Sequence, residues 1–94
     1  MLMHIDSSGE SVNLVSSYIV TYILGQAVQN ADEQNIAFFQ GQEISTQGYV
    51  ELDWAFADGI GGEAYRSQFL VTAADQPPFD IVLGYGEASI IGLA

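Results

Sequence analysis

A chain of 94 residues with 49% apolar residues predicts one small domain, spanning residues 1–94, rather than a disordered segment. Twelve acidic residues face a single Lys or Arg, so the formal net charge is −11, which excludes nucleic acid and anionic membrane surfaces as partners. The chain has no cysteine, so stability must come from the core or from a second subunit rather than from disulfides.

The distribution of apolar residues bears on localisation. The chain lacks the run of about 18 apolar residues that a membrane-spanning helix needs. Its N-terminus also lacks the basic and apolar regions of a signal peptide. We therefore expect an intracellular, cytoplasmic protein, or a piece cut from a larger one.

Short elements are expected in the first part of the chain. Met1–Asp6 predicts a short strand, and Val12–Val15 predicts a second extended segment. Ser16 and Ser17 are suited to cap the N-terminus of a helix over Tyr18–Leu24. Gly25 suits the position just after that helix, and the polar residues 26–34 then predict a loop.

From Ile36 onward the pattern is typical of antiparallel strands. Ile36–Phe39 and Glu43–Ser45 predict a hairpin with its turn at Gly41. Apolar and polar residues alternate over Gly48–Phe56, which predicts a half-buried strand. Its expected buried face carries Val50, Leu52, Trp54 and Phe56, and its exposed face carries Tyr49, Glu51 and Asp53.

The last part of the chain predicts two more strands. After a turn at Asp58–Gly62, Tyr65–Thr72 is expected to pair with the preceding strand. One face of this strand carries Tyr65, Ser67, Phe69 and Val71. Ala73–Pro78 predicts a loop, Ile81–Leu83 a strand buried on both faces, and Ala88–Leu93 a terminal helical turn. The sequence therefore predicts a mostly β fold with one or two short helices.

Six segments in a fixed order carry a resemblance to a known family. They are Ile5–Gly9, Val12–Ser16, Gln40–Ile44, Gly48–Leu52, Gln68–Val71 and Phe79–Gly84. Together they resemble the retropepsin-like aspartic proteases of retroelement polyproteins and their fungal derivatives. In that family an apolar strand enters an Asp-Ser/Thr-Gly turn, followed by a helix, a flap hairpin, an alternating strand and an apolar-Leu-Gly turn. The resemblance covers nearly the whole chain.

The resemblance implies a fold, an activity and a partner. The fold would be a small acid-protease-like (retropepsin) β-barrel lobe, closed or nearly closed. The activity would be that of a hydrolase, an aspartic endopeptidase that works as a homodimer on a peptide or polypeptide substrate. Each chain would contribute one aspartate, with no metal and no cofactor. The flap residues that contact the substrate would be Gly41, Gln42, Glu43 and Ile44.

Asp6 is the candidate catalytic residue, with Ser7, Ser8 and Gly9 as the supporting residues of its turn. In a homodimer the two carboxylates would share one proton, so that one activates water while the other polarises the scissile carbonyl. The structural alternative has equal weight. In it, Asp6 is a turn residue that accepts backbone N–H bonds from Ser8 or Gly9.

The spacing of the first motif departs from the family pattern. The family has Asp, Ser/Thr and Gly adjacent, whereas two serines separate Asp6 from Gly9. Counting from Ile5 places Asp6 at the catalytic position, and counting back from Asn13 places Ser7 there. If Ser7 holds that position, the chain is a catalytically inactive dimerisation or peptide-binding module of the same fold.

The chain is also short for the family. Only five residues precede Asp6 and ten follow Gly84, whereas family members have a further strand at each end that often builds the dimer interface. We therefore expect a retropepsin-like domain truncated at both ends. A fragment without independent function is a third interpretation.

Overall fold

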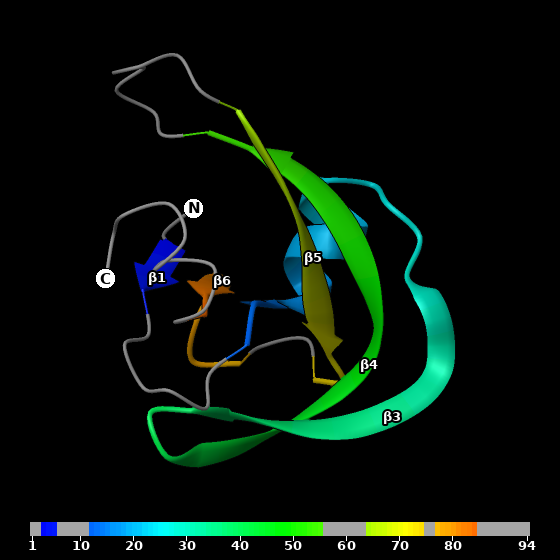
Figure 1. The fold of residues 1–94 in the computed structure, drawn as a ribbon. Coiled ribbons are helices and arrows are strands. Elements are labelled where there is room, and N and C mark those ends of the chain that lie inside the picture. The colour runs from blue at the N-terminus through cyan, green and yellow to red at the C-terminus, as the bar shows by residue number, and fades with distance from the viewer. Residues whose placement is uncertain (1–2, 6–11, 56–63, 75–76, 85–94) are drawn as a thin grey trace.

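The computed structural model describes residues 3–5, 12–55, 64–74 and 77–84 as a mostly β fold (Figure 1). Its elements are β1 (Met3–Ile5), β2 (Leu14–Val15), the helix η1 (Ile19–Ile23), β3 (Gln29–Phe39), β4 (Gln42–Trp54), β5 (Tyr65–Thr72) and β6 (Ile81–Leu83). The six strands form one mixed sheet in the order β1-β6-β2-β5-β4-β3. The expected β-rich fold is confirmed. Within the described residues the sheet is open, because its edge strands β1 and β3 do not pair with each other.

Segments from the two ends of the chain meet in the sheet. β6 lies between β1 and β2, parallel to β1 and antiparallel to β2. β2 pairs on its other side with β5, in parallel. All three residues of β6 are buried, as the continuous apolar run predicts for a strand with neighbours on both sides. The consecutive strands β1 and β2 are therefore separated by the strand that comes last among the described elements.

The helix is confirmed, although it is wound more widely than expected. The N–H of Leu24 donates to the carbonyl of Ile19 at 2.9 Å, a five-residue step that makes this turn a π-helix. The hydroxyl of Ser16 accepts the N–H of Tyr18 at 3.2 Å, in line with its predicted capping role. Gly25 follows with a φ of 63°, the left-handed geometry that suits a helix end.

The predicted hairpin is present and longer than expected. The register pair Phe39–Gln42 leaves Gln40 and Gly41 as a two-residue turn. Both have a positive φ, 51° and 78°, as a type I′ hairpin turn requires. The expectation of a loop through Gln34 is wrong, because β3 begins at Gln29. β3 pairs with β4 at Gln29 and again from Gln34 onward, and its polar side chains are tolerated because they lie exposed on an edge strand.

The core consists of two clusters on opposite faces of the sheet. The helix-side cluster contains Val15, Ile19, Val20, Val50, Leu52, Phe69, Val71, Ile81 and Leu83. The hairpin-side cluster contains Leu14, Ala37, Phe39, Ile44, Phe79 and Val82. Neighbouring residues of β2 and β6 enter opposite clusters, as the pleat of a strand requires. The predicted alternation of β5 is confirmed, since Ser67, Phe69 and Val71 are buried.

A bulge at Gly48 lets β4 contribute to both clusters. Gln47 pairs with Val71 and Tyr49 with Leu70, so Gly48 is an extra residue in the ladder. One extra residue moves every later side chain to the opposite face. Ile44 therefore packs in the hairpin-side cluster, while Val50 and Leu52 pack in the helix-side cluster. The two strands expected at Glu43–Ser45 and Gly48–Phe56 are one continuous strand bent at this bulge.

Several predicted features lie outside the described residues. They are the turn at Asp58–Gly62, the helical turn at Ala88–Leu93, the side chain of Phe56, and the four residues of the first motif, Asp6, Ser7, Ser8 and Gly9. The antiparallel pairing of β4 with β5 that the Asp58–Gly62 turn was expected to join is confirmed.

Candidate functional site

The residues that flank the candidate catalytic turn are both held at one end of β6. Ile5, the residue before Asp6, is the register partner of Leu83. Asn13 lies just before β2, and its side-chain oxygen accepts the N–H of Gly84 at 2.8 Å. The described residues on either side of the first motif are therefore fixed beside the Leu83–Gly84 end of the last strand.

Asn13 also ties this end of the sheet to β5. Its side-chain nitrogen donates to the carbonyl of Gln68 at 3.2 Å, and its own carbonyl accepts the N–H of Leu70 at 3.0 Å. One residue thus links three segments that are far apart in the sequence. The sequence marks Asn13 as part of a motif, but its partner Gly84 lies 71 residues away and could not be assigned from local pattern.

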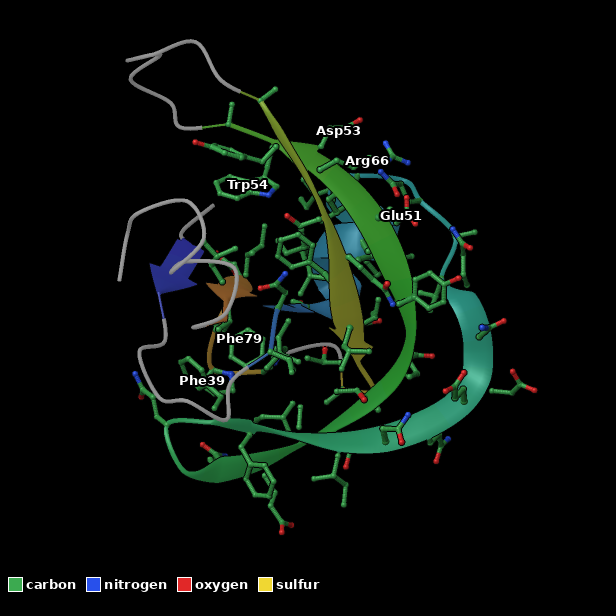
Figure 2. The ribbon with its side chains drawn as sticks, viewed as in Figure 1. Phe39, Glu51, Asp53, Trp54, Arg66 and Phe79 are labelled. Carbon is green, nitrogen blue, oxygen red and sulfur yellow. The ribbon has the colours of Figure 1, made fainter. Side chains whose placement is uncertain are left out.

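The β3–β4 hairpin packs against the segment that leads into β6. The rings of Phe39 and Phe79 lie 4.9 Å apart at an angle of 59°, which joins the hairpin to the segment leading into β6 (Figure 2). Of the four expected flap residues, Gly41, Gln42 and Glu43 are exposed, while Ile44 is only 8% exposed in the hairpin-side cluster. In this conformation Ile44 exposes little of its side chain to a ligand.

A groove of ≈ 540 Å³ runs beside the hairpin. Residues 42–45 of β4 line one side of it, and residues 72–74 with Pro77 and Pro78 line the other. The N–H of Ala73 donates to the carbonyl of Ser45 at 2.9 Å, which fixes the two walls together. Three of the expected flap residues, Gln42, Glu43 and Ile44, therefore border the groove. Its far wall contains the two prolines of the predicted Ala73–Pro78 loop, which make that wall rigid.

The outer face of β4 and β5 carries the chain's single Lys or Arg. The guanidinium of Arg66 lies 3.0 Å from a carboxylate oxygen of Glu51 and 3.0 Å from one of Asp53 (Figure 2). Hydrogen bonds to Asp53 and then Glu51 raise the pKa of Arg66 above its usual value. Because all three side chains are exposed, these ion pairs contribute little stability. They do mean that the single Lys or Arg of the protein is already paired with two carboxylates.

Trp54 marks the other end of β4. Its indole N–H donates to the hydroxyl of Ser67 at 3.0 Å, and its ring stacks on Tyr65 with centroids 4.7 Å apart. The side chain is half-buried, as the predicted alternation requires. Its polar atom is satisfied by a neighbouring strand, which is the usual arrangement for tryptophan in a core rather than in a ligand site.

Clusters of metal-binding side chains and membrane-spanning helices are both absent from the described residues. In the part of the chain that the structure describes, no three His, Asp or Glu side chains gather in a way that could hold a metal ion. Over the same residues, no helix has the length and apolar character needed to cross a membrane.

Comparisons with protein-family models, with curated proteins and with solved structures found no match to this chain. The resemblance to retropepsin-like proteases therefore rests on the residues of the six segments alone.

Proposed function

We propose that this chain is an acid-protease-type lobe that binds an extended peptide and, as a homodimer, cleaves it with Asp6 as the catalytic carboxylate. The observation that carries the proposal is the insertion of β6 between β1 and β2, with Asn13 bonded to Gly84. This arrangement supports the resemblance because it joins the segment before Asp6 to the Leu-Gly turn, the first and last parts of the family pattern.

The proposed chemistry needs two copies of the lobe. Two carboxylates held close together cannot both ionise at low cost, so the pair retains one proton. The ionised carboxylate removes a proton from water, which attacks the scissile carbonyl carbon, and the protonated carboxyl donates a hydrogen bond to the carbonyl oxygen. The proton taken from water then passes to the leaving amine. No covalent bond to the protein forms at any step.

The hairpin and the groove beside it support an extended peptide as the ligand. Gln42 and Glu43 are exposed at the start of β4, opposite the rigid Pro77–Pro78 wall. An extended peptide that lies in the groove can place alternate side chains against its two walls. With a formal charge of −11, the lobe favours neutral or basic peptides over acidic ones.

Cleavage is expected at acidic pH. The protein should cut members of a peptide library between about pH 4 and 6, the range in which one of two coupled carboxyls keeps its proton. Asp6→Asn should lower the rate at least about 100-fold, since the amide cannot act as a general base. Asp32→Asn removes the same charge from an exposed position on β3 and should leave the rate unchanged. Cleavage that survives in Asp6→Asn would refute the assignment.

A second candidate function is a catalytically inactive module that binds peptides with the same fold. The two serines between Asp6 and Gly9 favour it, because counting back from Asn13 puts Ser7 at the catalytic position. A dimer with Ser7 there would present two hydroxyls, which cannot activate water without a base. Peptide binding without cleavage over the whole acidic range would support this second function.

Dimerisation should respond to salt and pH. Tyr18, Tyr22, Ile23 and Leu24 leave apolar surface exposed in and beside η1, which a second copy would cover. Repulsion opposes the dimer, since each copy carries a formal charge of −11. Added salt screens that repulsion over about 10 Å at 0.1 M, and protonation at lower pH reduces it. Sedimentation equilibrium should show tighter association under both conditions, and a monomer at every salt concentration and pH would contradict the dimer.

A further inference from the structure

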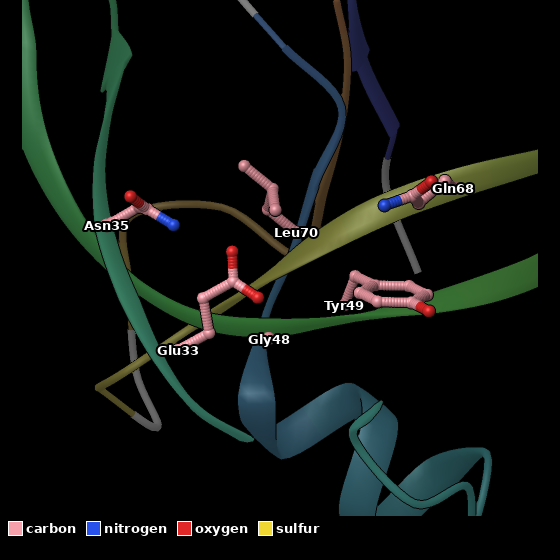
Figure 3. Close-up of a pocket in the computed structure, with 6 residues that line it drawn as sticks. All are labelled: Glu33, Asn35, Gly48, Tyr49, Gln68 and Leu70. Atoms are coloured by element: carbon pink, nitrogen blue, oxygen red, sulfur yellow. The ribbon is translucent and has the colours of Figure 1, made fainter. Parts of the chain in front are cut away.

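A small polar pocket lies where β3, β4 and β5 run side by side (Figure 3). It encloses ≈ 140 Å³ and is lined by Glu33, Asn35, Gly48, Tyr49, Gln68 and Leu70, here called the Glu33 pocket. Tyr49 and Leu70 are register partners, and both alternate with residues of the helix-side cluster. The pocket therefore opens on the face of the sheet opposite η1.

The pocket results from irregular pairing of the strands. The register of β3 with β4 shifts between Gln29 and Gln34, and the register of β4 with β5 shifts at Gly48. Both shifts lie next to the lining residues. A regular ladder would bring the three strands together here, so the two irregularities create the space.

Glu33 brings a negative charge to the pocket. Figure 3 shows its carboxylate turned inward, toward Leu70 and the amide of Asn35. The single Lys or Arg of the chain, Arg66, is bound to Glu51 and Asp53. Within the described residues, no cation lies against the Glu33 carboxylate. A ligand that supplies a positive charge would therefore find a preformed partner.

The lining suits a guanidinium. Two of the five N–H donors of this planar group can bond the Glu33 carboxylate side by side. The half-buried ring of Tyr49 offers an aromatic face to a cation. Leu70 provides apolar surface for the methylene stem of a long side chain. A divalent metal fits less well, because the pocket contains one carboxylate rather than several.

We propose that the Glu33 pocket binds an arginine side chain of a basic partner polypeptide. The proposal does not depend on Asp6 or on cleavage. The formal charge of −11 draws a basic polypeptide to the lobe, and the pocket gives one of its side chains a defined position. β3 is an edge strand among the described elements, so an extended partner can also use its backbone groups.

The probe is the peptide acetyl-Gly-Arg-Gly-amide, titrated into the full chain and followed by the backbone amide signals in NMR spectra. We expect saturable shifts at Glu33, Gly48, Tyr49 and Gln68, with a Kd on the order of 1 mM. The same peptide with citrulline in place of arginine keeps the shape without the charge and should bind at least tenfold more weakly. Equal binding of the two peptides would overturn the proposal.

Two matched variants separate a site from general attraction. Glu33→Gln should raise the Kd of the arginine peptide at least tenfold. Asp32→Asn removes the same charge from the neighbouring residue of β3, which does not line the pocket, and should change the Kd less than twofold. An equal loss of affinity in the two variants would show that the peptide is held by diffuse electrostatic attraction, and it would refute the pocket as its binding site.

Acetyl-arginine amide distinguishes a polypeptide from a free amino-acid derivative. The tripeptide should bind at least threefold more tightly, because its backbone can reach the edge of β3. If acetyl-arginine amide binds as tightly as the tripeptide, the assignment to a polypeptide partner is wrong. Shifts that map to other residues, with the pocket unchanged, would overturn the whole proposal.

Discussion

Gly48→Ala is expected to destabilise the fold by about 3 kcal/mol, since left-handed geometry costs about 1–2 kcal/mol and overpacking about 1–3 kcal/mol. Gly48 has a φ of 39°, which a residue with a Cβ rarely adopts. An added Cβ would also overlap the carbonyl oxygen of Gln29 and lie 2.8 Å from that of Asn30. Both are backbone atoms of β3, so they cannot move without breaking the pairing with β4. Urea denaturation should show a lower midpoint with an unchanged slope.

Gly41→Ala is the matched control for this change. Gly41 also has a positive φ, 78°, but an added Cβ there would have no atom within 4 Å. The variant should therefore show only the backbone cost, about 1 kcal/mol. A difference of roughly 2 kcal/mol between the two variants would measure the contact with β3. Equal losses would show that the bulge can relax around a methyl group.

The bulge also limits what the pattern of β4 can predict. Ile44, Val50 and Leu52 all stand at even positions, and strict alternation would place them on one face. The structure places Ile44 on the opposite face from the other two, because Gly48 adds one residue to the ladder. A glycine inside a strand is a signal for a bulge, but its effect on the later register follows only from the pairing with β5.

The strands that the sequence predicts correctly are those whose burial is visible locally. The alternation of Tyr65–Thr72 and the apolar run Ile81–Leu83 both report burial directly, and both strands have the expected bounds. The first half of β3 has no such signal, because residues 29–34 are all exposed and all polar except Ala31. Its pairing with β4, at Gln29 and again from Gln34, is not encoded by local composition.

The candidate site likewise has features that the sequence predicts and contacts that it does not. Residue types and their order are enough to single out Asp6, its serines and the hairpin. The bond from Asn13 to Gly84 and the contact of Phe39 with Phe79 are tertiary, and they join segments 71 and 40 residues apart. The same limit applies to the Glu33 pocket, which combines three strands at two irregular registers.

The two anchors of the first motif make its spacing testable. Ile5 is fixed by its pairing with Leu83, and Asn13 by its bond to Gly84. Counting from the first anchor selects Asp6 as the catalytic residue, and counting from the second selects Ser7. Deletion of Ser7 makes Asp6, Ser8 and Gly9 adjacent, so that both counts select Asp6. If Asp6 already holds the position in the native chain, the deletion variant should cleave at least as fast as the native protein.

Exchange of the two side chains should abolish cleavage. In the double variant Asp6→Ser/Ser7→Asp, composition and charge are unchanged, but the carboxylate moves by one residue, which turns it to the opposite side of an extended chain. We expect the rate between about pH 4 and 6 to fall at least about 100-fold, the usual contribution of a general base. Circular dichroism and the urea midpoint serve as controls for folding. If the exchange instead creates cleavage in a native chain that has none, Ser7 holds the catalytic position, and the natural protein binds peptides without cutting them.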